Sequence, residues 1–261
     1  MTNIRFYAKA PHFLTLVLLL LSGLAWGQWY TAAPQDTKSE AATIVEKADR
    51  IRFPAEGFQV NVGITTKEAD GTTEERRYRI LSKGNEKTVV LVTEPASERG
   101  QIILMRGHDL WIFMPDVSQP IRISLAQRLT GQVANGDLAR ANFAGDYTPR
   151  IVGSEKIGNN DYYILDLKAV SRRVTYQRVK YWVNKKNFWP LKAEFYSLSN
   201  RLLKRCQYED FQRMAGGIRP TRLVMEDALR RGEQSVLEYG SMRRRNLPDK
   251  IFTKDYLKKL D

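Results

Sequence analysis

Histidine, cysteine and paired carboxylate side chains are the residues in this sequence whose chemistry could support catalysis or metal binding. The 261 residues include two histidines, His12 and His108, and one cysteine, Cys206. A single cysteine excludes an intrachain disulfide and any zinc or iron–sulfur site built on several cysteines. Two histidines leave almost nothing for a site that binds metal through imidazole. We therefore expect no metal, no cofactor and no redox chemistry.

The remaining polar side chains do not form a recognisable catalytic set. His108 lies in Gly107-His108-Asp109, which is typical of a hairpin turn, and a nucleophilic triad needs a well-placed base. Glu209 and Asp210 are adjacent, so on a strand they point to opposite faces and cannot share one site. Glycine-rich phosphate-binding strings and nucleophile-elbow strings do not occur in the sequence. We predict that the protein is not an enzyme.

Aromatic residues are the more informative group. Trp111 and Phe113 alternate with Leu110 and Ile112, so both faces of a strand over 110–114 are apolar and both must be covered. We expect Trp111 and Phe113 to point into an apolar interior, with Leu110 and Ile112 on the opposite face. The other residues expected to line this cavity are Trp182, Phe195 and Tyr196. An ordinary sheet core explains any single one of these side chains at least as well.

Short strands joined by tight turns must position these side chains. Apolar residues recur at every second position in Phe58, Val60 and Val62. Turn sequences such as Asp70-Gly71 separate such segments at intervals of roughly 8–12 residues, which is typical of an antiparallel sheet. We predict a mainly β fold with one meander-like antiparallel sheet. Its further strands are expected at 88–93, 101–106, 110–114, 150–156, 162–167, 177–183, 191–197, 202–208, 218–225 and 235–239.

Helical segments are expected at both ends of the sheet and once in its middle. Thr37 and Glu40 form a capping-box pattern before apolar residues at helical spacing, which predicts a short helix that ends near Pro54. Glycines interrupt residues 120–146, which predicts short helical or loop segments. Residues 252–260 predict a C-terminal helix. A sheet that curves around such helices has a concave apolar face that they need not fill.

The N-terminal residues indicate export. Arg5 and Lys9 precede an apolar run over 13–21, which is shorter than the roughly 20 residues that span a bilayer. Small residues then precede Gln28 as in a signal-peptide cleavage site, and no cysteine follows the run to be lipidated. We expect a soluble, exported protein; an uncleaved membrane anchor is the alternative. The predicted parts are a signal peptide over 1–27, a linker over 28–35 and a single domain over 36–261.

The chain is basic, with a formal net charge of +13 at pH 7. An exported protein meets little nucleic acid, so we expect no nucleic-acid partner and consider anionic lipid head groups and acidic proteins instead. A solvated basic surface is the alternative. Basic clusters near predicted strand ends are expected at the rims of the sheet. The cluster expected to face a membrane or a partner is Arg243, Arg244 and Arg245.

An ordered set of motifs resembles a known family. The motifs include RGHDLWIFMP (106–115), YWV (181–183), PLKAEFY (190–196) and FTKDYL (252–257). The chain is similar over its mature length to the outer membrane lipoprotein-sorting protein family, relatives of the periplasmic carrier LolA. The resemblance implies an incomplete β-barrel closed by short helices, an interior that holds acyl chains, and no catalytic residue. It also implies a mid-chain lid, whose expected residues are Leu125, Leu129 and Leu138.

The resemblance favours a non-enzymatic periplasmic carrier that binds the acyl chains of lipoproteins or lipids for transfer toward the outer membrane. Members of the family are often associated with inner-membrane exporters of the resistance-nodulation-division (RND) type, so such an exporter is an expected partner. A transient contact with an anionic membrane surface is also expected. The alternative is an accessory or adaptor subunit of the RND-type exporter without lipid transport. A hydrolase of envelope lipids is a third hypothesis, which lacks a catalytic base.

Overall fold

The computed structural model describes residues 39–230 and 232–257. The predicted signal peptide and linker lie outside these residues. In the described part, fourteen strands form one antiparallel sheet in the order β6-β5-β4-β3-β2-β1-β15-β14-β13-β12-β11-β10-β9, with β16 also paired to β1. The strands are β1 (Phe58–Lys67), β2 (Thr73–Lys83), β3 (Lys87–Glu94), β4 (Ile102–Arg106), β5 (Asp109–Phe113), β6 (Ile121–Ile123), β9 (Tyr147–Ile157), β10 (Asn160–Ala169), β11 (Arg178–Asn184), β12 (Pro190–Tyr196), β13 (Leu202–Met214), β14 (Gly217–Asp227), β15 (Gln234–Tyr239) and β16 (Arg243–Arg244).

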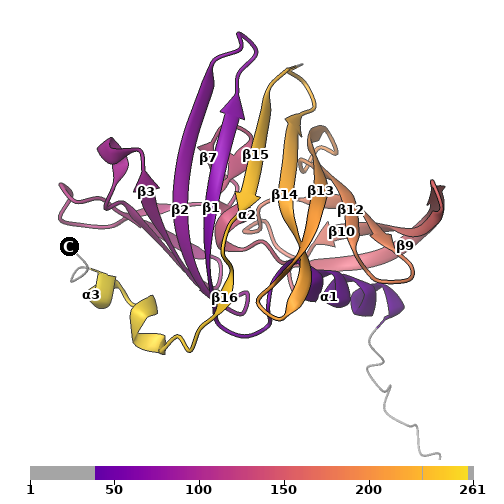
Figure 1. Ribbon diagram of the computed structural model, residues 1–261, viewed down its shortest axis with the longest axis horizontal. Coiled ribbons are helices and arrows are strands. Elements are labelled where there is room, and N and C mark those ends of the chain that lie inside the picture. Colours follow the sequence, from indigo (N-terminus) through magenta and orange to yellow (C-terminus); the bar gives the residue numbers. More distant parts are fainter. Residues whose placement is uncertain (1–38, 231, 258–261) are drawn as a thin grey trace, which may run out of the picture. The chain divides into compact units, whose positions relative to one another are not determined.

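Two meanders make up the sheet, and the pairing of β1 with β15 joins them. Val62 on β1 stands opposite Tyr239 on β15, so residues from the two ends of the domain meet in the middle of the sheet. The terminal strands β6 and β9 are not neighbours, so the sheet does not close into a complete barrel. Figure 1 shows its strands curving around the elements between β6 and β9. The prediction of a mainly β fold with one open antiparallel sheet is confirmed.

Helix α1 (Glu40–Arg52) precedes the sheet and packs against β9, β12 and β14. Its N-cap is Ser39, whose hydroxyl accepts the backbone N–H of Ala42 at 3.2 Å, and not the predicted Thr37, which lies outside the described residues. The helix ends two residues before Pro54, as predicted, because the residue before a proline is pushed out of the helical region. Its buried face is Ala41, Ile44, Val45, Ala48, Asp49 and Arg52.

Residues 124–146, called here the mid-chain segment, contain a hairpin and one short helix. The hairpin is β7 (Arg128–Thr130) with β8 (Val133–Ala134), and the helix is α2 (Asn135–Ala139). Gly131 turns the hairpin with a φ of 47°, and a Cβ there would collide with the hydroxyls of Thr66 and Ser235 on the sheet. The segment therefore lies directly against β1 and β15.

Strands β3 to β5 pack against apolar residues on both faces, and the two faces belong to different apolar clusters. The main cluster includes side chains of α1 and of the mid-chain segment. Leu110 belongs to this cluster, and Ile112 packs against it. A second cluster on the other face contains Leu104 and packs Trp111 and Phe113 against it. The expectation that Trp111 and Phe113 point into the main interior is therefore wrong. Both faces of β5 are apolar, so alternation alone does not say which face is which.

The C-terminal residues cover that second cluster. They form a 3₁₀ helix, η2 (Asp249–Phe252), and a short helix, α3 (Lys254–Leu257), before which Thr253 accepts the backbone N–H of Tyr256 at 3.3 Å. A second 3₁₀ helix, η1 (Ala96–Glu98), follows β3. Across residues 39–230 and 232–257, no helix combines the length and apolar character that a bilayer crossing requires.

Candidate ligand-binding interior

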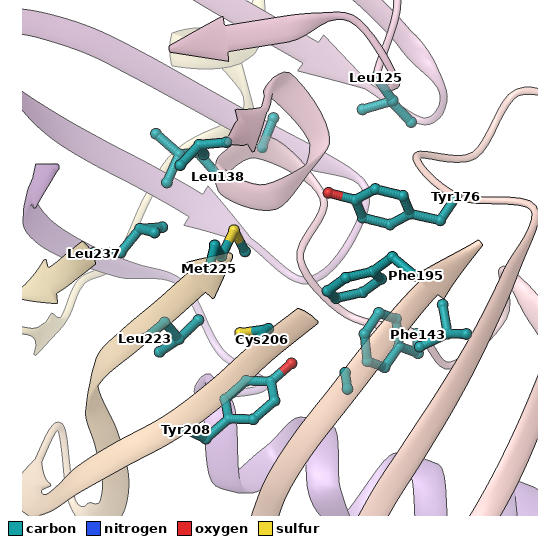
Figure 2. Packing of buried hydrophobic residues seen from close by; sticks show 14 of the residues in the cluster. Leu125, Leu138, Phe143, Tyr176, Phe195, Cys206, Tyr208, Leu223, Met225 and Leu237 are labelled. Carbon is teal, nitrogen blue, oxygen red and sulfur yellow. The ribbon is translucent and has the colours of Figure 1, made fainter. Parts of the chain in front are cut away.

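Aromatic and aliphatic side chains from β11 to β15 meet in the main cluster, as Figure 2 shows. Tyr176 stacks on Phe195 with ring centroids 4.2 Å apart, and Phe143 meets Tyr181 edge to face at 5.2 Å. The Sγ atom of Cys206 is buried among them, and burial raises the pKa of this thiol. These side chains form a continuous apolar surface on the inner face of the sheet.

The mid-chain segment covers that surface with its own apolar side chains. The predicted lid residues Leu125 and Leu138 belong to the main cluster and Leu129 packs against it, so all three lie on the covering segment. Figure 2 places Leu138 of α2 beside Met225 and Leu237. Burying one leucine side chain stabilises by about 1.5–3 kcal/mol. The segment therefore shields the interior and is itself stabilised by doing so.

Polar contacts tie the mid-chain segment to α1. The Asp49 carboxylate accepts the backbone N–H groups of Phe143 at 2.9 Å and Ala144 at 2.7 Å. Arg52, 3.4 Å from Asp49, donates to the carbonyl of Ala141. Burial raises the pKa of Asp49 to about 6, with Arg52 and the two N–H groups acting in the opposite direction. The covering segment is thus held by charged groups inside an apolar environment.

A second set of contacts holds the end of the segment. The guanidinium of Arg140 bonds Asp146 through two nitrogens, at 2.6 and 2.7 Å, and lies 3.2 Å from Glu86 of the β2–β3 turn. His108 Nε2 lies 3.0 Å from the same Asp146. His108 is in the turn between β4 and β5, as predicted, and serves as a contact of Asp146. These groups connect the segment to two turns of the sheet.

A third set of contacts holds the tip of the β7–β8 hairpin. The backbone N–H of Gln132 donates to the Ser235 hydroxyl at 2.9 Å, and its side-chain amide donates to Glu233 at 3.0 Å. The ammonium of Lys204 donates to the Gln132 carbonyl, and burial lowers the pKa of Lys204. On α2, Asp137 accepts the Tyr176 hydroxyl at 2.7 Å. The segment is therefore fixed at its tip, its helix and its end.

Two hollows remain on either side of the hairpin. The inner hollow, of about 150 Å³, lies over Tyr78, Ile103 and Ile112 and is roofed by residues 123–135. The rim groove, of about 330 Å³, runs between the hairpin and the start of β13, and Arg128 lines both hollows. Pockets for drug-sized ligands usually measure about 300–1,000 Å³. The inner hollow is therefore too small for a long acyl chain while the mid-chain segment is in place.

The five aromatic residues predicted to line one cavity do not come together. Phe195 is in the main cluster, whereas Trp111 and Phe113 pack against the second cluster. Trp182 and Tyr196 each follow a residue whose side chain belongs to the main cluster, so their own side chains lie on the outer face of the sheet. Lys192 lies 4.5 Å from the Trp182 ring, whose indole N–H donates to Glu155 at 2.7 Å. On that face Arg178 lies 5.4 Å from the Tyr196 ring.

The arginines predicted to form a docking surface are exposed. Arg243 and Arg244 form β16, opposite Gln59 and Phe58 of β1, and Arg245 follows them. Arg244 donates to the carbonyl of Ala215 at 3.2 Å.

Buried charges are the site residues that the sequence analysis missed. Asp49 and Arg52 follow Val45 and Ala48 by four residues, so they fall on the apolar face of α1. This helical spacing could have marked Asp49 and Arg52 as buried. Arg140 lies in an irregular segment, where no periodicity marks burial. In the described residues, no group of three or more His, Cys, Asp or Glu side chains is arranged to hold a metal ion.

Comparisons with known proteins place the chain in a family. A family model described only as an uncharacterized protein matches residues 84–259. A LolA superfamily protein from Nitrosomonas europaea is 62% identical, with a TM-score of 0.81; the match covers 84% of this chain and 100% of that one. No curated protein matches the chain.

Two further solved structures share the fold. A DUF1329 family protein from Desulfovibrio piger is 21% identical with a TM-score of 0.72, over 83% of this chain and 97% of that one. A putative outer membrane lipoprotein-sorting protein domain from Vibrio parahaemolyticus is 20% identical with a TM-score of 0.71, over 84% and 98%. The identity and coverage of the Nitrosomonas europaea protein are well beyond those of a shared fold alone. The chain belongs to the LolA superfamily.

Proposed function

We propose that this protein is a non-enzymatic periplasmic carrier that binds acyl chains of lipids or lipoproteins between the concave face of its sheet and the mid-chain segment. An acyl chain in water is disfavoured by about 0.8 kcal/mol for each CH₂ group, so carrying it through an aqueous compartment requires a shielding interior. The observation that carries the proposal is the apolar main cluster under a separate covering segment. The signal-type N-terminus and membership of the LolA superfamily support the same function.

Opening of the covering segment is the central step of this proposal. The main cluster is continuous from β1 to β15 and is closed by Leu125, Leu138 and Phe143 of the segment. Displacing these three side chains exposes the apolar surface, and the acyl chain then replaces their contacts. The hydrogen bonds and ion pairs of Asp49, Arg140 and Gln132 must break during opening, so they set its free-energy cost. Closure of a segment over a bound ligand is a common way to exclude water.

An accessory subunit of an RND-type exporter is the second candidate. The filled interior favours it, because an adaptor needs a stable surface and no cavity. The two candidates differ in what is bound to the protein when it is purified from the cell envelope. A native mass spectrum of the protein purified from its own periplasm tests them. The carrier is expected to show a bound lipid mass that is lost on delipidation. An empty protein in stable complex with a membrane exporter would overturn the carrier and favour the adaptor.

A further inference from the structure

We propose that the rim groove binds the phosphate of a phospholipid head group, so that the carried ligand is an anionic phospholipid whose acyl chain enters under the β7–β8 hairpin. The inference rests on the carrier function and names the class of its ligand. A lipoprotein N-terminus carries acyl chains but no phosphate, so the inference separates two classes of cargo.

The charge of the groove is the first argument. In the described part of the chain, four cationic side chains line it, namely Arg128, Arg201, Lys204 and Arg230, against the single carboxylate of Asp227. That carboxylate accepts the backbone N–H groups of Leu229 and Arg230, at 2.7 and 2.9 Å. Arg230 also lies 3.4 Å from Glu233, a carboxylate behind the groove. The groove therefore keeps an excess of positive charge.

Two arginines account for that excess. Within the described residues, the side chains of Arg128 and Arg201 form no ion pair and no hydrogen bond, and both are exposed. Several other exposed arginines on the sheet have a carboxylate partner, as Arg77 has in Glu94 at 3.2 Å. An arginine guanidinium presents donors in a planar fork that matches phosphate oxygens. Arg128 and Arg201 can therefore take a phosphate without first breaking an existing pair.

The floor of the groove connects the charges to the apolar interior. Leu203, Val133 and Tyr176 line the groove, and all three also belong to the main cluster or pack against it. Leu229, at the rim, is 60% exposed, although it is a large apolar side chain. Arg128 lines the groove on one side of the hairpin and the inner hollow on the other. A head group bound at Arg128 therefore places its acyl chain next to the inner hollow.

Binding of two matched amphiphiles tests the inference. Lysophosphatidylglycerol and monoacylglycerol with the same acyl chain differ in the phosphate, and inorganic phosphate serves as the third probe. In the wild-type protein the phosphate-bearing amphiphile should bind at least about tenfold more tightly, as expected for charge-assisted hydrogen bonds. In the double variant Arg128→Gln/Arg201→Gln, the ratio of the affinity for lysophosphatidylglycerol to that for monoacylglycerol should fall to about threefold or less. Affinity for monoacylglycerol should stay unchanged.

Arg213→Gln is the matched control, because Arg213 is exposed near the far end of β13 from Lys204. It should keep the wild-type ratio, and the melting temperature of each variant checks that it is folded. Equal affinity of the two amphiphiles in the wild type would overturn the phosphate inference and leave the carrier standing. Binding of inorganic phosphate without either amphiphile would overturn both, since the groove would then serve a free anion. Binding of no probe would also count against both.

Discussion

The carboxylate of Asp49 accepts a 2.7 Å hydrogen bond from the backbone N–H of Ala144, and this contact joins α1 to the mid-chain segment across 95 residues of sequence. The same oxygen accepts the N–H of Phe143, whose ring lies in the main cluster. One buried side chain thus fixes both the backbone and an apolar anchor of the covering segment. In the proposed carrier, this contact must break before the interior can open.

Replacing Asp49 by Asn should remove a pH dependence of stability. The pKa of Asp49 is 3.8 in its ordinary state and about 6 in the folded protein, because burial disfavours the charge. The raised value means that the contribution of Asp49 to stability is fully present below pH 3.8 and is lost as the pH rises through 6. The difference in unfolding free energy between wild type and Asp49→Asn should therefore fall by about 2 kcal/mol from pH 4 to pH 7.

Denaturant unfolding of both proteins across that pH range measures the difference. A difference that does not change with pH would mean that Asp49 ionises in the folded protein as it does in the unfolded chain.

Leu138→Ala should loosen the mid-chain segment. Leu138 is 6% exposed in the main cluster, so its truncation should cost about 2–5 kcal/mol of stability. Because less apolar contact opposes opening, a larger fraction of the protein is open, and the apparent affinity for a soluble single-chain amphiphile should rise. Chemical unfolding and amphiphile titration together check this. Destabilisation with unchanged or weaker binding would argue that Leu138 belongs to a permanent core.

Trp111→Ala should affect stability without affecting ligand binding. Trp111 packs against the second cluster, and the Lys254 ammonium of α3 lies 4.2 Å from its ring. The truncation should lower the unfolding free energy by about 1–3 kcal/mol, less than for a fully buried tryptophan. Amphiphile affinity should stay within about twofold, because the residue faces away from the main cluster. Loss of binding in a stable variant would place Trp111 at the ligand instead.

Replacing Arg243, Arg244 and Arg245 by Ser should weaken binding to anionic vesicles. Each basic residue near an anionic surface contributes about 1 kcal/mol, and the attraction decays over a Debye length of about 8 Å at physiological salt. The wild type should bind anionic vesicles at low salt and lose them as salt is added, while neutral vesicles bind weakly throughout. Flotation across a salt series measures this. Salt-insensitive binding, or equal binding by the triple variant, would mean that these arginines are solvated surface residues and do not bind the membrane.

The strands could be predicted because alternation and turn glycines agree. The predicted strand over 88–93 is β3 (Lys87–Glu94), and Asp70-Gly71 forms the β1–β2 turn, where Gly71 has a φ of 89° and Asp70 accepts the N–H of Thr72. The facing of Trp111 could not be predicted, because β5 is apolar on both sides. Its direction depends on which face the C-terminal residues cover.

The polar ties could be predicted only in part. Asp49 and Arg52 lie on the apolar face of α1, so helical spacing marks them as buried. The β7–β8 hairpin has strands of three and two residues, too short for a period to appear. Its position depends on contacts of Gln132 with Ser235 and Lys204, which are far away in the sequence. Such long-range polar pairing leaves no local pattern.

The proposed carrier function requires that the mid-chain segment moves before a ligand can enter. A Cβ atom at Gly136 of α2 would lie 2.9 Å from the Thr175 Cβ, which is shorter than the separation of about 3.8 Å found in disulfides, so the two backbones must move apart by about 1 Å for a bond to form. We therefore suggest Gly136→Cys/Thr175→Cys in a Cys206→Ala background, with each single cysteine variant as a control. The oxidised, locked protein should take up no lysophosphatidylglycerol, and reduction should restore uptake. Equal uptake by the locked and reduced forms would contradict an interior that opens at this segment.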